Sequence, residues 1–310
     1  MKVFHAVNEI VEWRKAQVGV FHKKIGFVPT MGCLHEGHLE LVRKCKTNND
    51  VTVVSIFVNP SQFAPTEDLD KYPRTLEQDL SVLEAAGVDA CFAPSPREMY
   101  PQGISLEIDQ QRGPFVTVLG VSEQLEGRTR PNFFRGVATV VTKLLNIVSP
   151  AVAYFGQKDI QQFIVLKVMT EELFMNTQIE MLPIVRDARG LALSSRNRYL
   201  CDESRAVSTA IYRGLNAAAA KVAEAAQTDG QIERETVIQA AMACWQPLVE
   251  SRDFHIDYVS VAEGNNLTEM DPVTTQAADV VISCAIFVTD RHDPATVVRL
   301  IDNVIVPRCM

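Results

Sequence analysis

The sequence of 310 residues has no long hydrophobic run. Its longest nearly apolar stretch, ADVVISCAIFV at 278–288, contains an aspartate and is shorter than the roughly 20 residues that a helix needs to cross a bilayer. The first residues, MKVFHAVNEIVEWRKA, carry Glu9 and Glu12 among their apolar positions, which predicts a surface helix and no signal-peptide core. We therefore expect a cytoplasmic protein without a membrane partner.

Paired cysteines are also lacking. The chain has seven cysteines with no CxxC pair, at Cys33, Cys45, Cys91, Cys201, Cys244, Cys284 and Cys309. A scattered and odd set of this kind is typical of reduced thiols in an intracellular protein. It predicts neither a disulfide framework nor a zinc site.

Positive charge is in deficit, because 30 Lys and Arg face 38 Asp and Glu for a formal net charge of −8. This deficit disfavours nonspecific binding to nucleic acid. The charge is uneven, since residues 127–198 hold ten basic and five acidic side chains and so carry +5, which leaves −13 for the remainder. The commoner interpretation of such a segment is a solvated surface, and the alternative is a pocket for a small polyanion.

The pattern of apolar runs predicts two domains. Over the first 185 residues, near-continuous apolar strands alternate with helices, which predicts an α/β domain whose parallel sheet is covered on both faces. The expected strands are 25–28, 51–59, 88–94, 152–156 and 179–185, and the main expected helices are 75–87, 133–150 and 159–174.

After Arg186 two helical stretches, about 203–227 and 232–250, precede three strand-like runs at 255–263, 278–288 and 297–306. Helices grouped before strands predict a second, smaller α+β domain. We therefore expect domains at 1–185 and 186–310, with a hinge near VRDARG.

Polar clusters follow the ends of several predicted strands, at the sheet edge where open α/β sheets bind ligands. They are HEGH (35–38), NPSQF (59–63), GQKDIQQ (156–162) and, at the hinge, LALSSRN (191–197). His35 and His38 share a helical face and can point at one ligand, whereas zinc prefers an i, i+4 pair with a third ligand. A capping or packing pair is the alternative, because chance supplies this spacing in about one such chain in ten.

The other clusters offer donors for an anion. Lys158 places a cation beside a helix start, where Gly156 allows a ligand close approach and Asp159 could orient the amine. Hydroxyls and a guanidinium in SSRN (194–197) suit phosphate oxygens. A solvent-facing lysine and an ordinary polar turn are the alternatives. The uncharged pair Asn59 and Gln62 suits hydroxyl or amide recognition, or else caps a turn.

Together the motifs resemble the pantothenate synthetase family, the pantoate–β-alanine ligases. They run in order through nearly the whole chain: PTMGCLHEGH, SIFVNPSQF, YPRTLEQDL, RPNFFRGVATVV, FGQKDIQQ, LALSSRNRYL and RLIDN. The resemblance implies a Rossmann-like domain of the nucleotidyltransferase type, a small C-terminal domain and a homodimer. It also implies a reaction in which ATP and Mg²⁺ activate pantoate to pantoyl adenylate with release of pyrophosphate, after which β-alanine displaces AMP.

The resemblance also implies roles for single residues. His38 would be the proton donor, with His35 and Lys158 as further catalytic groups. ATP would contact Met31, Gly32, Cys33, Leu34, His35, Glu36, Gly37, His38, Gly156, Gln157, Lys158, Asp159, Val185, Leu193, Ser194, Ser195 and Arg196. Pantoate and β-alanine would contact Gln62, Gln162, Asn59 and Arg130. The magnesium ligands stay open, with Asp79 as the carboxylate to consider.

One departure from the family pattern is Phe133, which stands where the family usually has histidine. The stretch at 109–121 is also longer than is typical. Two alternatives follow: an adenylyltransferase acting on a phosphorylated metabolite, and a catalytically impaired nucleotide-binding protein. Gln62 and Gln162 argue against the first, and the intact HEGH, GQKD and SSRN motifs argue against the second.

Overall fold

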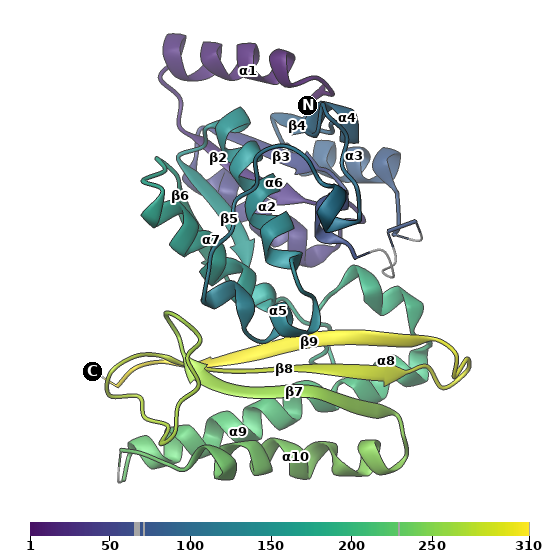
Figure 1. Ribbon diagram of the computed structural model, residues 1–310, viewed down its shortest axis with the longest axis vertical. Coiled ribbons are helices and arrows are strands. Elements are labelled where there is room, and N and C mark those ends of the chain that lie inside the picture. The colour runs from purple at the N-terminus through teal and green to yellow at the C-terminus, as the bar shows by residue number, and fades with distance from the viewer. Residues whose placement is uncertain (65–68, 71, 229, 310) are drawn as a thin grey trace. The chain divides into compact units, whose positions relative to one another are not determined.

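The computed structural model describes residues 1–64, 69–70, 72–228 and 230–309. The chain divides into two compact units (Figure 1), each with a core of its own. The first comprises residues 1–157 and 161–183, and the second comprises residues 158–160 and those from 184 onward. None of the helices in the described ranges is long and apolar enough to cross a membrane.

The first unit contains a six-stranded sheet in the order β1-β4-β3-β2-β5-β6, and every neighbouring pair is parallel. Its strands are β1 (Lys2–Phe4), β2 (Ile25–Thr30), β3 (Val51–Ile56), β4 (Ala90–Phe92), β5 (Val152–Gly156) and β6 (Gln178–Leu182). From β2 the chain adds β3 and β4 on one side, and β5 and β6 then extend the sheet on the other. The topological switch point therefore lies between β2 and β5, and parallel sheets bind ligands at the carboxyl ends of strands there.

Helices cover both faces of this sheet, as the continuous apolar strands predicted. They are α1 (Val7–Lys15), α2 (Glu36–Asn48), α3 (Leu76–Ala85), α4 (Pro96–Met99), α5 (Glu126–Thr129), α6 (Phe133–Val148) and α7 (Ile160–Glu172). Neighbouring residues of β2 serve opposite faces: Phe27 packs in the cluster that includes Val141 of α6, and Val28 packs in the cluster that includes Val42 of α2. Alternating side chains on a strand buried on both sides produce this division.

The N-terminus departs from the predicted surface helix. Lys2–Phe4 forms β1, which pairs in parallel with Ala90–Phe92 of β4, and helix α1 begins only at Val7. Three residues are too few to show a period of two, so the strand is recognisable only through its partner. Glu9 and Glu12 do lie in the helix that follows.

The second unit is an antiparallel sheet of β7 (Phe254–Glu263), β8 (Val280–Thr289) and β9 (Val297–Val306), with helices α8 (Asp202–Ser208), α9 (Ala210–Ala226) and α10 (Arg234–Glu250). Trp245 of α10 is fully buried and donates its indole N–H to the Ala210 carbonyl at 2.8 Å. The predicted α+β architecture is confirmed. The single helix expected over 203–227 is split, because the hydroxyls of Ser208 and Thr209 donate to carbonyls of the preceding turn.

A close helix approach positions the loop after β3. Gly136 of α6 lies so near the turn η2 (Pro60–Gln62) that a Cβ on it would stand 2.2 Å from the Ser61 carbonyl oxygen and 2.7 Å from the Gln62 Cα. Both of those atoms belong to the backbone, so they cannot rotate away. Only glycine allows α6 to hold this turn.

We expect Gly136→Ala to displace η2 from α6 and to lower both stability and activity. The overpacking should cost about 1–3 kcal/mol of unfolding free energy, measured by chemical denaturation. Gly19→Ala is the matched control, because a Cβ there would have no neighbour within 4 Å. Equal stability of the two variants would show that η2 can move away from α6 without a cost in free energy.

Candidate active site

The loop after β2 is held by a buried carboxylate on α3. Asp79 accepts the backbone N–H of Cys33 at 2.9 Å and that of Leu34 at 2.8 Å, and it is 3% exposed. Gly32 and Cys33 both have positive φ, at 82° and 52°. A Cβ at Gly32 would lie 3.0 Å from Asp79 Oδ2, so this sharp turn needs glycine on both conformational and steric grounds. The carboxylate considered for magnesium thus shapes the loop.

The HEGH motif opens helix α2, with His35 at the N-cap and His38 in the first turn. Their ring centroids lie 4.1 Å apart with planes tilted by 33°. The backbone N–H of His35 donates to His38 Nδ1 at 3.3 Å, so Nδ1 carries the lone pair. In the neutral ring the proton therefore sits on Nε2, which makes that atom a donor. The local fold thus selects the tautomer that a proton donor needs.

Beside this loop lies Gln62, in the turn that follows β3. Its amide Nε2 donates to Met31 Sδ at 3.3 Å, and its Oε1 accepts from Asn59 Nδ2 at 3.0 Å. The Asn59 amide also donates to the Gly136 carbonyl and accepts the Tyr100 hydroxyl at 2.7 Å, and it is 1% exposed. Asn59 therefore orients Gln62 through a network of protein hydrogen bonds.

Phe133, the departure from the family pattern, packs on Arg130. The guanidinium carbon of Arg130 lies 3.8 Å from the centroid of the Phe133 ring, within the range of cation–π attraction. The same guanidinium donates to the Gln62 carbonyl at 3.4 Å. The phenyl ring therefore supports an arginine that touches the turn bearing Gln62.

The two adjacent glutamines of helix α7 have different surroundings. Gln161 is 3% exposed; its Nε2 donates to the carbonyls of Val121 and Gln124 at 2.8 Å, and its Oε1 accepts the Glu126 N–H at 3.0 Å. Gln161 thus holds the chain before α6 in place. Gln162, which the sequence resemblance led us to expect at the pantoate site, is half-buried.

The GQKD motif (156–159) follows β5, the neighbour of β2 across the switch point. A Cβ at Gly156 would meet no atom within 4 Å, which leaves room for a ligand beside the backbone. In the next turn, Lys158 Nζ lies 3.7 Å from Asp159 Oδ1, and the lysine side chain is 20% exposed. Asp159 can therefore orient the amine, as the sequence predicted.

Within the second unit, the segment at residues 185–196 folds back on itself. The backbone N–H of Leu193 donates to the Val185 carbonyl at 3.0 Å, which places these two predicted ATP contacts side by side. Ser194 caps the short helix of residues 195–199, and its hydroxyl accepts the Arg196 N–H at 3.3 Å. The SSRN donors thus start from an ordered turn.

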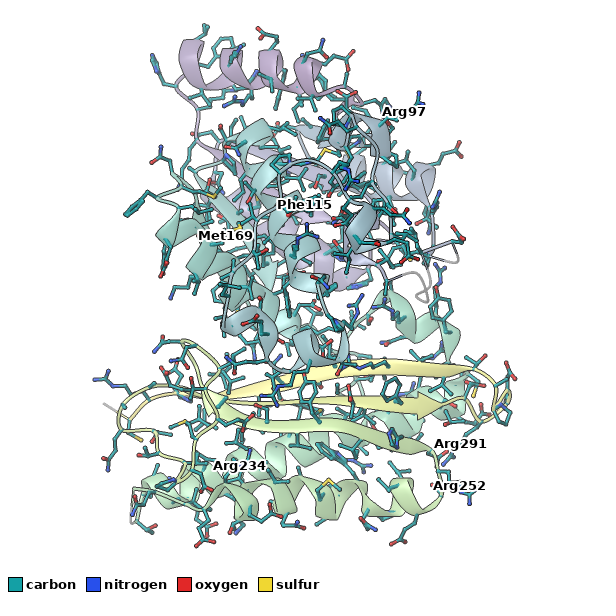
Figure 2. The ribbon with its side chains drawn as sticks, in the orientation of Figure 1. Arg97, Phe115, Met169, Arg234, Arg252 and Arg291 are labelled. Atoms are coloured by element: carbon teal, nitrogen blue, oxygen red, sulfur yellow. The ribbon has the colours of Figure 1, made fainter. Side chains whose placement is uncertain are left out.

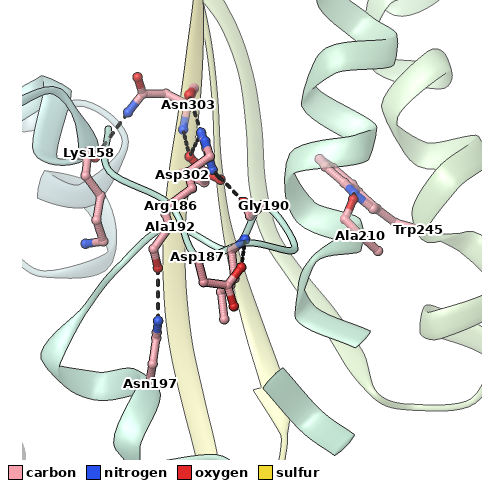
Figure 3. A network of polar contacts seen from close by, with 11 residues as sticks. Lys158, Arg186, Asp187, Gly190, Ala192, Asn197, Ala210, Trp245, Asp302 and Asn303 are labelled. Carbon is pink, nitrogen blue, oxygen red and sulfur yellow. Dashed lines mark hydrogen bonds and ion pairs between the residues drawn. The ribbon is translucent and has the colours of Figure 1, made fainter. Parts of the chain in front are cut away.

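A buried ion pair secures this segment to β9 (Figure 3). Arg186 donates to both carboxylate oxygens of Asp302, at 2.6 and 2.8 Å, and its guanidinium carbon lies 3.6 Å from the centroid of the Tyr212 ring. Burial raises the pKa of Asp302, and the guanidinium opposes that shift. The next residue, Asn303, donates from its side chain to the Lys158 carbonyl at 3.1 Å. The RLIDN motif therefore holds both Lys158 and the segment that begins at Arg186.

The structure groups the predicted residues by unit. The first unit holds residues 31–38, 156 and 157, together with Asn59, Gln62, Arg130 and Gln162, and the second holds Lys158, Asp159, Val185 and 193–196. Sequence reasoning missed the positioning roles of Asp79, Gln161 and Asp302. Only the buried aspartate of RLIDN, an acidic residue inside an apolar strand, gave a signal in the sequence.

Comparisons with known proteins agree with this geometry. The family model described as pantoate-beta-alanine ligase matches residues 2–305. A relative from Saccharomyces cerevisiae named pantoate–beta-alanine ligase is 58% identical over 310 residues, covering 99% of this chain and 100% of its own length.

Solved structures of this family have the same fold. Pantothenate synthetase from Thermus thermophilus has a TM-score of 0.81 at 36% identity, over 98% of this chain and 99% of its own. Pantoate-beta-alanine ligase from Francisella tularensis, complexed with beta-gamma ATP and beta-alanine, has a TM-score of 0.71 at 32% identity, over 98% and 97% of the two chains. Because the match spans both units and every motif of the site, the chain belongs to the pantoate–β-alanine ligase family.

Proposed function

We propose that this chain joins pantoate to β-alanine with the consumption of ATP, through a pantoyl adenylate. The observation that carries the proposal is the His35–His38 pair at the topological switch point, with Gln62 held beside the same loop through Met31. Donors to a triphosphate and a neutral amide for a hydroxy acid thus lie on the same edge of one sheet.

In the first step, an oxygen of the pantoate carboxylate attacks the α-phosphorus of ATP, and the bond to pyrophosphate breaks. Negative charge builds on the phosphate oxygens, so fixed donors lower the barrier. The Nε2 proton of His38 is one such donor, and the imidazole of His35 and the amine of Lys158 supply others. Ser194, Ser195 and Arg196 would bind the nucleotide from the second unit.

In the second step, the amine of β-alanine attacks the acyl carbon of the adenylate, AMP leaves with the electron pair of the broken bond, and the amine loses a proton. Gln62 and Gln162 are uncharged, so they can bind the hydroxyls and the acyl carbonyl of the pantoyl group without attracting a competing phosphate. Arg130 would act through the turn that carries Gln62. No covalent enzyme nucleophile is required, and Cys33 need not be one.

Magnesium would neutralise the triphosphate. Both oxygens of Asp79 already accept backbone N–H groups, so we expect the ion to be held mainly by phosphate oxygens and water, as is common for Mg²⁺ with nucleotides. A cytoplasmic homodimer, with residues 1–185 as its ATP- and pantoate-binding domain and 186–310 as a lid, completes the proposal. The adenylyltransferase alternative is not favoured, because the named relatives are ligases.

Isotope exchange tests this function. Pantoate and ATP alone should support exchange of labelled pyrophosphate into ATP, because the first step is reversible. Addition of β-alanine should divert the adenylate into pantothenate and AMP. Exchange that needs a phosphorylated metabolite in place of pantoate would identify an adenylyltransferase, and no exchange with either would identify an impaired nucleotide-binding protein.

A further inference from the structure

Three metal-ligating side chains meet at one end of the second unit, on elements that the proposed reaction does not use. They are Cys201 and Glu203 at the start of α8 and His292 in the turn between β8 and β9. One ligand atom from each, the thiol sulfur, a carboxylate oxygen and a ring nitrogen, lies within 4.8 Å of the other two. From this geometry we propose that the three side chains form a zinc site that fastens α8 to the β8–β9 turn.

The spacing fits a tetrahedral ion. Zinc bonds of 2.0–2.3 Å place two ligand atoms of one tetrahedron roughly 3.3–3.8 Å apart. His292 Nε2 lies 3.2 Å from Glu203 Oε2, and the Cys201 sulfur lies within 4.8 Å of both. That sulfur also accepts the Ser204 N–H at 3.4 Å, and a zinc-bound thiolate can keep such a hydrogen bond.

The donor set also fits. Thiolate, imidazole and carboxylate are the three ligand types that zinc combines, and a set of three leaves the fourth position for water.

The backbone around the cluster is fixed before any ion binds. Asp290 accepts the N–H groups of Cys201 at 2.6 Å and of His292 at 3.0 Å, which joins the two ligand-bearing segments. The hydroxyl of Ser204 accepts the N–H of Arg291 at 2.8 Å. A ligand set held by such contacts loses little entropy on binding, which favours affinity.

A neighbouring cation does not repel the ion. Arg291, labelled in Figure 2 in the turn after β8, donates through Nε and one terminal nitrogen to both oxygens of Asp253, at 2.8 and 2.7 Å. Its charge is therefore offset by the carboxylate of a residue immediately before β7. The carboxylate and thiolate of the cluster are left to balance the two positive charges of zinc.

The sequence predicted no zinc site, because it contains no CxxC pair and no i, i+4 histidine pair. Two of the ligands, Cys201 and Glu203, lie two residues apart in the chain, but His292 reaches them only through the fold of the antiparallel sheet. Among the residues that the structure describes, this is the one cluster of three or more Cys, His, Asp and Glu side chains with such spacing.

Titration calorimetry of the full chain with ZnCl₂ tests the site, after chelation, without ATP and with a phosphine reductant that does not bind zinc. We expect one zinc per chain, with affinity weakened at least about 100-fold in Cys201→Ser and His292→Ala and about 10-fold in Glu203→Gln. Zinc at 100 times its dissociation constant should raise the Tm by about 5 °C. Co²⁺ in place of zinc should give a thiolate charge-transfer band that Cys201→Ser abolishes.

Matched controls separate this site from casual binding to other thiols and imidazoles. Cys244 and Cys309 are exposed cysteines, and His255 is an exposed histidine of β7, so Cys244→Ser, Cys309→Ser and His255→Ala should bind zinc as the parent does. Circular dichroism checks that each variant is folded, and His292→Ala alters only an exposed side chain. Zinc affinity that is absent in the parent, or unchanged in both Cys201→Ser and His292→Ala, would overturn the proposal.

Discussion

Replacing His38 with asparagine should slow pantoate-dependent pyrophosphate exchange by about 10²–10³-fold, because the transition state loses a fixed donor. The fold should not change. An asparagine oxygen can occupy the place of Nδ1 and still accept the His35 N–H, which preserves the start of α2. The Tm of the variant should therefore stay close to that of the parent.

Glutamine at the same position should keep the donor and lose the helix cap, which is the reverse of what asparagine does. Its amide nitrogen can reach the place of Nε2 and donate, but it loses the hydrogen bond to the His35 backbone. His38→Gln should therefore exchange pyrophosphate about ten times faster than His38→Asn, with some loss of stability. His255→Ala, in the second unit, serves as the control. Near-normal pyrophosphate exchange in His38→Asn would show that His38 has no catalytic role.

Asp302→Ala should destabilise the protein by about 3–5 kcal/mol, the largest stability effect that we expect. The two side chains of the Arg186–Asp302 pair are 15% and 3% exposed, so removing the carboxylate leaves a guanidinium charge poorly solvated. Urea unfolding measures the loss. Affinity for ATP should fall as well, because the segment from Val185 to Leu193 and the Lys158 carbonyl both depend on this end of β9.

Two comparisons show whether an unpaired charge is the cause. The double variant Arg186→Met with Asp302→Leu removes both charges and should recover at least half of the lost stability. Glu269→Ala breaks a more exposed pair with Arg234, whose side chains are 40% and 35% exposed, and should cost about 1 kcal/mol. Equal losses for Asp302→Ala and the double variant would mean that packing, and not charge, governs the site.

Much of the fold can be read from local patterns. The runs at 51–56 and 152–156 are mostly apolar, without a polar residue at every second position, because helices cover both faces of the sheet, and that composition identifies buried parallel strands. Strand β1 could not be found in this way, since its three residues become a strand only by pairing with β4. Length and burial thus decide which strands the sequence reveals.

The residues of the candidate site also fall into those that the sequence reveals and those that only the structure reveals. HEGH, GQKD and SSRN are contiguous, and each follows a strand or turn that the apolar pattern predicts. The sequence could not say which of the adjacent Gln161 and Gln162 holds the fold, because the partners of Gln161 lie at residues 121–126. Nor could it show that Asp79 shapes the loop after β2, which is joined to it only by hydrogen bonds across the sheet edge.

The sequence by itself determined the fold class, the order of the main strands and helices and the motifs that identify the family, because these depend on neighbours along the chain. Only the folded structure showed the tautomer of His38 and the support of Gln62 by Asn59, and tertiary contacts alone decided the Arg186–Asp302 pair and the meeting of Cys201 with His292. Each of these depends on the direction of a side chain or on a partner from another part of the fold. Hydrogen bonds and metal ligation require distances of a few ångströms, and spacing along the chain does not set them.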